Sequence, residues 1–204
     1  MKRYVPRFVF GAALGAFLSL PVWAATTTYK IDPRHSSAQF AVTHLMISSV
    51  RGEFHSVNGT VVFDNANISN SSVNVTIDAT TVDTREPDRD KHLKSADFFD
   101  VSSFPTITFV STKVEAVDPG KLKVTGNLTI RGVTKQVILD VSAPKAAIKD
   151  PWGLERTAVA ASTKLNRQDF GVAWNKTLDS GGVVVGDDVS VTLDVEMFVP
   201  PPAK

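Results

Sequence analysis

The sequence has no cysteine, which excludes disulfides, thiolate metal sites and a cysteine nucleophile. It also lacks the Gly-x-Ser-x-Gly nucleophile elbow, the His-Glu-x-x-His zinc motif and the Gly-x-x-x-x-Gly-Lys phosphate loop. Ser36 follows His35 directly, but neighbours in a strand point to opposite faces, so the pair is poorly placed to act as nucleophile and base. We therefore predict no catalytic residue.

The chain also lacks an excess of charge of one sign, since 22 Lys and Arg stand against 21 Asp and Glu. Three of the basic residues are Lys2, Arg3 and Arg7, at the extreme N-terminus. Without them, 19 basic residues face 21 acidic ones, a net charge of about −2. Proteins that bind nucleic acid usually have a basic excess or a stripe of Lys and Arg, and this sequence has neither.

Long hydrophobic runs are missing apart from residues 8–20, which follow the basic start and are too few to span a bilayer comfortably. A basic start, a short apolar run and a small residue at Ala24 are typical of a signal peptide. We predict that residues 1–24 are a signal peptide cleaved after Ala24, which leaves no stable membrane insertion. An uncleaved anchor is the alternative, because Trp23 is bulky at this place.

Residues 25–204 are enough for a single domain with a sizeable core. Their dominant hydrophobic period is two, as in strands with one apolar face, for example over residues 38–44, 73–77, 122–130, 137–141 and 189–197. Turn residues such as Asn58-Gly59 and Asp118-Pro119-Gly120 separate these runs. We predict an all-β fold of seven to nine antiparallel strands that closes into a barrel, because the helix candidates are too brief to cover an open sheet.

The stretch from Asp83 to Phe109 interrupts the strand pattern and places many charged side chains beside phenylalanines. Pro87 and the two acids that follow it suit the start of a helix, and the basic residues at 91–94 suit its end. Ser95 is a candidate cap for a second short turn through Phe99. We predict a short helical insert around residues 87–99 at the mouth of the barrel.

Phenylalanine is abundant, with 12 residues, whereas tyrosine is rare, with 2. A lumen lined by phenylalanine and aliphatic side chains offers few partners to a polar ligand and suits a hydrocarbon chain better than a sugar or nucleotide. The predicted lumen residues are Phe40, Val42, Phe54, Phe63, Val75, Phe98, Phe99, Phe109, Phe170 and Trp174.

Four polar residues are candidates for a ligand's head group: His44, Arg89, His92 and Arg167. His44 continues the apolar face of its strand, so we expect it to point inward, where a polar side chain is costly unless it is paired. Either a neighbouring residue or a ligand satisfies it. The cations suit an anionic or quinone head group, or else they pair with nearby carboxylates on a solvated face.

Metal binding has less support, because His35, His44, His55 and His92 are widely spaced and include no tight ligand pair. A barrel can still gather three of them with an aspartate, Asp32 or Asp90. The simpler interpretation is that each histidine bonds a neighbour at a strand end, so no metal site and no cofactor are predicted.

Several blocks of sequence resemble the YceI-like family of exported polyisoprenoid-binding proteins: IDPRHSSAQFAVTHLMISSVRGEF, VDTREPDRDKHLKSADFFDVSSFPTITFVST, GNLTIRGVTKQVILDV, DPWG and NRQDFGV. The resemblance runs from about Tyr29 to Val199. It implies a lipocalin-like, eight-stranded antiparallel barrel in the bacterial periplasm that holds an isoprenoid quinone or polyprenyl phosphate, without catalysis. Family members often occur as dimers, which makes a homodimer one of the expected assemblies. One departure is Val159, at a position where the family usually has an aromatic ring, so the lumen is expected to be wider there.

Three functions remain open at this point. The first is a carrier of an isoprenoid lipid. The second is a metal- or histidine-dependent enzyme that acts on a lipid-like substrate through His44, His92 and Asp90. The third is a stress-response interaction module whose barrel is filled by its own side chains, as eight-stranded barrels can be.

Overall fold

The computed structural model describes residues 26–179 and 181–202, and the predicted signal peptide lies outside them. Nearly all of the described chain is strand, turn or loop, and the α-helix among these residues, α1 (Pro87–Lys94), has eight residues. No helix in the described part of the chain is both long and apolar enough to cross a membrane.

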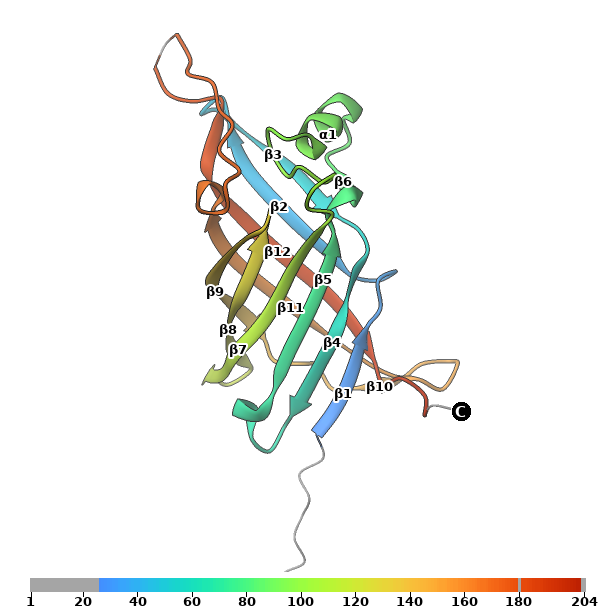
Figure 1. Cartoon of the computed structure of the whole chain (residues 1–204). Helices are drawn as coiled ribbons and strands as arrows, with labels where there is room; N and C mark the ends of the chain where they lie inside the picture. The colour runs from blue at the N-terminus through green and yellow to red at the C-terminus, as the bar shows by residue number, and fades with distance from the viewer. Residues whose placement is uncertain (1–25, 180, 203–204) are drawn as a thin grey trace, which may run out of the picture.

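The strands form a closed, eight-stranded antiparallel barrel (Figure 1), so the predicted fold class is confirmed. The sheet closes where β12 (Val185–Phe198) pairs with β11 (Glu155–Asn166) along the whole length of β11. The other barrel strands are β1 (Thr26–Ile31), β2 (Ser37–His44), β3 (Ser48–Phe54), β4 (Val57–Asp64), β5 (Ser72–Asp78), β6 (Val82–Asp83), β7 (Thr106–Asp118), β8 (Lys121–Ile130) and β9 (Val133–Ser142).

Three of the eight barrel strands are each interrupted once, so that two short segments serve as one long strand. The first of these strands is made of β1 and β2, which both pair with β12. The second is made of β4, which pairs with β1, and β3, which pairs with β2. The third is made of β5, which pairs with β4, and β6, which pairs with β3. The interruptions are the turn at 32–36, the residues 55–56 and the 3₁₀ turn η2 (Ala79–Thr81). Because they lie opposite one another in neighbouring strands, this wall of the barrel bends along one line.

Among neighbouring long strands of the barrel, β9 and β11 have the fewest paired residues along their seam. Only Val141 and Asp140 of β9 pair with Ala161 and Ser162 of β11. Side chains extend the seam, because the Ser142 hydroxyl group bonds the backbone of Ala160 in both directions. A two-residue strand, β10 (Ile148–Lys149), pairs with the start of β11 at the end of the barrel away from α1 (Figure 1).

Helix α1 lies over the opposite end of the barrel, where β2 ends and β12 begins (Figure 1). Its predicted start is confirmed: Pro87 is at the first turn, and the Glu86 carboxylate accepts hydrogen bonds from the Asp88 and Arg89 N–H groups. The helix ends at Lys94, and Ser95 caps it. Residues 96–99 form hydrogen-bonded turns in place of a second helical turn, which brings Phe98 and Phe99 against the barrel.

Candidate functional site

The barrel contains two apolar chambers that adjoin along its axis. The lower chamber has a volume of about 190 Å³ and the upper chamber, beneath α1, about 270 Å³. They share six wall residues and therefore adjoin: Phe40, Phe54, Ile107, Ile130, Leu165 and Val191. An engineered apolar cavity of about 150 Å³ takes up benzene. Each chamber is larger than that, which argues against a barrel filled by its own side chains.

The alternating strand pattern builds the wall of the lower chamber. Val73, Val75 and Ile77 of β5 face it, and so do Val137, Leu139 and Val141 of β9, which is separated from β5 by β7 and β8. The sheet also contributes Val159 of β11. A ring at position 159 would project into this space, so the small side chain leaves the lower chamber wider.

The upper chamber carries the aromatic and polar residues. Phe98 and Trp174 have ring centroids 5.3 Å apart, and the His92 ring packs edge-on against both, at 4.9 and 5.0 Å. Phe99 packs edge-on against Phe54, with centroids 5.3 Å apart, at the junction of the chambers. α1 and the turns after it therefore supply an aromatic ceiling to a lumen whose walls are aliphatic.

All ten predicted lumen residues line one or both chambers. Phe63, Val75 and Phe109 face the lower chamber. The upper chamber is lined by Val42, Phe98, Phe99, Phe170 and Trp174, and the two remaining residues, Phe40 and Phe54, face both. Their contact with a ligand stays a prediction, but their position is the one that such contact requires.

The four predicted head-group residues also line the upper chamber, but they differ in how many of their polar atoms already have hydrogen-bond partners. The Arg89 guanidinium donates through Nε to the Thr84 hydroxyl, at 2.8 Å, and through Nη2 to the Thr84 carbonyl, at 2.9 Å. His92 Nε2 lies 2.8 Å from an Asp97 carboxylate oxygen. His44 makes no side-chain hydrogen bond within the described residues. Arg89 Nη1, the His44 ring and the second His92 nitrogen are therefore polar groups at this end that no hydrogen bond within the described residues uses.

Arg167 differs from the other three because the protein already uses its guanidinium. It is buried in η3 (Arg167–Phe170) and donates to the carbonyls of Val172, Trp174, Val185 and Gly186 and to the Asp187 carboxylate. Burial lowers the pKa of Arg167, and the Asp187 carboxylate opposes that shift. Arg167 ties the segment around Trp174 to β12, which explains a conspicuous basic residue in the NRQDFGV block without a ligand.

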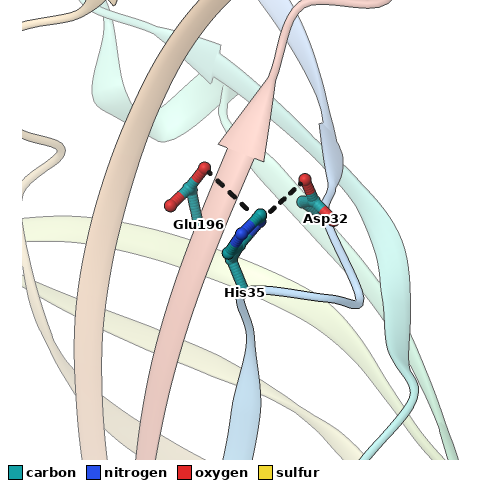
Figure 2. A group of neighbouring side chains, drawn as sticks. All are labelled: Asp32, His35 and Glu196. Atoms are coloured by element: carbon teal, nitrogen blue, oxygen red, sulfur yellow. Dashed lines mark hydrogen bonds and ion pairs between the residues drawn. The ribbon is translucent and has the colours of Figure 1, made fainter.

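The metal alternative through His44, His92 and Asp90 finds no cluster in the described residues. Asp90 Oδ1 instead accepts hydrogen bonds from the Thr84 N–H and hydroxyl groups, at 2.8 and 2.5 Å. Within residues 26–179 and 181–202, the group of three close enough to share an ion is Asp32, His35 and Glu196 (Figure 2). These residues lie on the outer side of the strand interruption at 32–36, away from both chambers.

An arginine already pairs with both carboxylates of that group. Arg156 Nη1 lies 2.9 Å from Asp32 Oδ2 and 2.7 Å from Glu196 Oε1, and its Nε lies 2.7 Å from Asp150 Oδ2. Burial alone would raise the Asp32 pKa, but hydrogen bonds from Arg156, Arg34 and His35 hold it well below its usual range. Hydrogen bonds to Asp150 and Asp32 raise the Arg156 pKa. We name these residues, Asp32, His35, Asp150, Arg156 and Glu196, the Arg156 network.

The Arg156 network joins segments that sequence reasoning did not connect. Asp150 also accepts hydrogen bonds from the Trp152 and Leu154 N–H groups, at 2.9 and 2.8 Å, so it shapes the DPWG turn. The Asp-Pro pairs at 32–33 and 150–151 are the sequence signal for these turns, but nothing in the sequence pairs them with one arginine. The two sequence blocks of the resemblance that contain these Asp-Pro pairs therefore hold turns of the barrel in place through the Arg156 network.

Comparisons with known proteins agree with this geometry. A family model described as the YceI-like domain matches residues 29–197. The UPF0312 protein VPA0850 of Vibrio parahaemolyticus is 40% identical over 166 residues, which are 80% of this chain and 87% of the relative.

Solved structures show the same barrel. The YCEI protein of Campylobacter jejuni aligns with a TM-score of 0.64 at 33% identity, over 78% of this chain and 90% of its own. BcnA of Burkholderia cenocepacia aligns with a TM-score of 0.71 at 23% identity, over 81% and 98%. A polyisoprenoid binding domain from Saccharophagus degradans aligns with a TM-score of 0.59 at 16% identity, over 85% and 99%. The last two show the fold alone. With the matched domain covering nearly the whole barrel, the chain belongs to the YceI-like family.

Proposed function

We propose that this protein is a periplasmic carrier that holds the hydrocarbon chain of an isoprenoid lipid, an isoprenoid quinone or a polyprenyl phosphate, in its barrel. The observation that carries the proposal is the pair of adjoining apolar chambers inside the barrel. The walls of both chambers are mostly apolar, and their arginine and histidine side chains all lie at the α1 end. The space therefore suits a hydrocarbon chain better than a sugar or nucleotide, which needs polar partners along its length. The likeness to a polyisoprenoid binding domain is consistent with this class of ligand.

Burial of the chain supplies the affinity. At roughly 25 cal/mol per Å² of apolar surface, one five-carbon isoprene unit contributes on the order of 2 kcal/mol. Association itself costs about 4–15 kcal/mol, so a single unit is not retained and several units are needed. The joined chambers favour such a chain over a compact ligand, because only a chain can occupy both at once.

The head group is expected at the α1 end, where Arg89, His44 and His92 present polar atoms to the upper chamber. Arg89 is permanently charged and suits a phosphate or a quinone carbonyl. These three side chains select the cargo more than they retain it, since most of the buried surface belongs to the chain. The same scarcity of polar groups makes a binding protein the better proposal than an enzyme.

Export is part of the proposal. An isoprenoid lipid cannot leave a membrane unaided, so a carrier in the periplasm would hold it between the two membranes. Cleavage after Ala24 would release the barrel from its leader. N-terminal sequencing of the protein from a periplasmic extract tests this part separately from ligand binding.

The decisive test is to purify the processed protein, extract it with organic solvent and identify bound molecules by mass spectrometry. We expect an isoprenoid species near one per chain or per dimer. Val75→Trp places an indole in the lower chamber and should abolish retention while the barrel stays folded. Val110→Trp is the matched control, because Val110 lies on β7 with its side chain exposed. Equal retention by both folded variants, or an empty extract after incubation with candidate lipids, would refute the proposal.

A further inference from the structure

The turn between β2 and β3 exposes three consecutive apolar residues, Leu45, Met46 and Ile47. Met46 is 60% exposed and Ile47 is 84% exposed, the highest value among the large apolar residues of the described chain. A single exposed apolar side chain is ordinary, but three in succession in one hairpin turn are typical of a contact surface.

The conformation of this turn makes its residue types more informative. Leu45 and Met46 have φ angles of 52° and 63°, and the Ile47 N–H bonds the His44 carbonyl, at 3.1 Å. His44 pairs with Ser48, so the hairpin loop has three residues, and the first two have left-handed φ angles, where asparagine and glycine are favoured. Leucine and methionine each cost about 1–2 kcal/mol in that conformation. The tip therefore carries apolar side chains although its left-handed φ angles disfavour them, which indicates a function for these side chains.

The tip also continues the upper chamber. His44 and Val184 line that chamber, and the Leu45 N–H bonds the Val184 carbonyl, at 2.8 Å. Figure 1 shows the turn beside the start of β12, at the same end of the barrel as α1. A molecule that passes between the chamber and its surroundings at this end passes close to Leu45–Ile47.

Charge argues for a lipid surface at the tip. The hairpin from Ala38 to Arg51 contains no aspartate or glutamate, and serines 48 and 49 flank its apolar residues. The opposite end of the barrel also exposes apolar side chains, Ile148 and Trp152, but these lie beside the carboxylates of the Arg156 network and line neither chamber. The segment before β12, whose Gly182 lies beside Met46, adds one cation and one anion, Lys176 and Asp179. The apolar tip therefore has no excess of negative charge around it, which suits the boundary between head groups and acyl chains.

We propose that Leu45–Ile47 is a membrane-docking tip, which inserts into the interface of a lipid bilayer and brings the upper chamber to the surface where the cargo resides. The proposal takes its purpose from the carrier function, but the insertion itself requires no cargo. Membrane binding can therefore be measured apart from ligand retention.

The test uses residues 25–204, which hold the entire described barrel and omit the apolar segment 8–20, since that segment would bind lipid itself. Sedimentation with vesicles of phosphatidylethanolamine and phosphatidylglycerol measures the bound fraction. The double variant Leu45→Asn with Met46→Gly supplies residue types that left-handed φ angles favour, so it should fold at least as stably as the parent while vesicle binding falls roughly tenfold or more. Ile148→Ser is the matched control at the opposite end and should leave binding unchanged.

Two tryptophans report which end approaches the bilayer. Trp174 lines the upper chamber and Trp152 lies at the opposite end, and these are the tryptophans of residues 25–204. With brominated lipids in the vesicles, Trp152→Phe, which leaves Trp174 as the reporter, should show quenching. Trp174→Phe, which leaves Trp152, should show little.

Three outcomes would overturn the docking tip: vesicle binding that the double variant retains, binding lost in Ile148→Ser, or quenching confined to Trp152. A shift in oligomeric state in the double variant with unchanged vesicle binding would assign the turn to a contact between copies of this chain. An empty solvent extract together with tip-dependent vesicle binding would refute the carrier and leave the docking tip standing.

Discussion

Replacing Arg156 with methionine should destabilise the protein by about 3 kcal/mol, because it leaves a buried carboxylate without its main cation. Asp32 is 3% exposed, and Arg156 Nη1 lies 2.9 Å from its Oδ2. Methionine fills much of the volume of the arginine stem, so the change removes charge and hydrogen bonds more than packing. The variant therefore tests the ionic contribution of the network.

The magnitude follows from what remains around the carboxylates. Removing one partner of a buried ion pair costs about 3–5 kcal/mol. Asp32 keeps three donors, the Arg34 N–H at 3.0 Å, Arg34 Nε at 3.4 Å and the His35 ring at 3.1 Å. Asp150, which is also buried, keeps the Trp152 and Leu154 N–H groups. Glu196 is exposed enough for water to solvate it. These compensations place the cost near the lower limit, and for a protein of this size about 3 kcal/mol corresponds to a fall in Tm of roughly 6–12 °C.

Denaturant unfolding monitored by circular dichroism measures the change, with Lys164→Met as the control. Lys164 Nζ lies 2.7 Å from Asp188 Oδ2 across the same β11–β12 ladder, but both side chains are exposed, so its loss should cost less than about 1 kcal/mol. A double variant, Asp32→Asn with Arg156→Met, should recover part of the stability. Equal small effects of Arg156→Met and Lys164→Met would refute the reasoning.

Three further predictions follow from the same structure. Hydrogen bonds hold the pKa values of Asp32 and Asp150 below the usual range, so these carboxylates stabilise the fold above their unfolded pKa of about 4 and stop doing so as pH falls through the folded values. The free energy of unfolding should therefore be level above about pH 5 and drop below about pH 4. In Arg156→Met its dependence on pH should be weaker. Gly126→Val should destabilise by about 1–3 kcal/mol, measured by the denaturation midpoint, because a Cβ there meets the Phe109 ring. Glu86→Ala removes the cap of α1 at about 1 kcal/mol and should speed amide exchange in residues 87–94; unchanged protection would contradict it.

Periodicity alone predicted much of the fold and the direction of its side chains. The alternation from Ala38 to His44 places four residues on the chamber wall, and the alternation along 189–197 does the same in β12. This works because a strand in a closed barrel has one face in the lumen and one in solvent, so hydrophobic period and burial coincide. The helix start was equally readable, since capping depends on residues near in sequence.

Features that depend on distant contacts could not be predicted. Arg156 and Asp32 are 124 residues apart in the chain, and only barrel closure brings them together. Arg167 looked like a ligand-facing cation because its sequence does not reveal that four backbone carbonyls surround it. The interruptions of three strands were also hidden, since each resembles an ordinary turn between separate strands.

Those interruptions lie in the wall of the lower chamber, since Ile31 and Ala38, on either side of the first, both face only that chamber. They align across β1–β2, β3–β4 and β5–β6, and Phe54, beside the interruption at 55–56, faces both chambers. Its ring lies 5.7 Å from that of Phe40 and 5.3 Å from that of Phe99, centroid to centroid. A bend in the wall thus coincides with an aromatic contact between strand and insert. We infer that a long chain must pass these three rings to fill the lower chamber, so its depth of entry depends on how firmly α1 holds Phe99 in place.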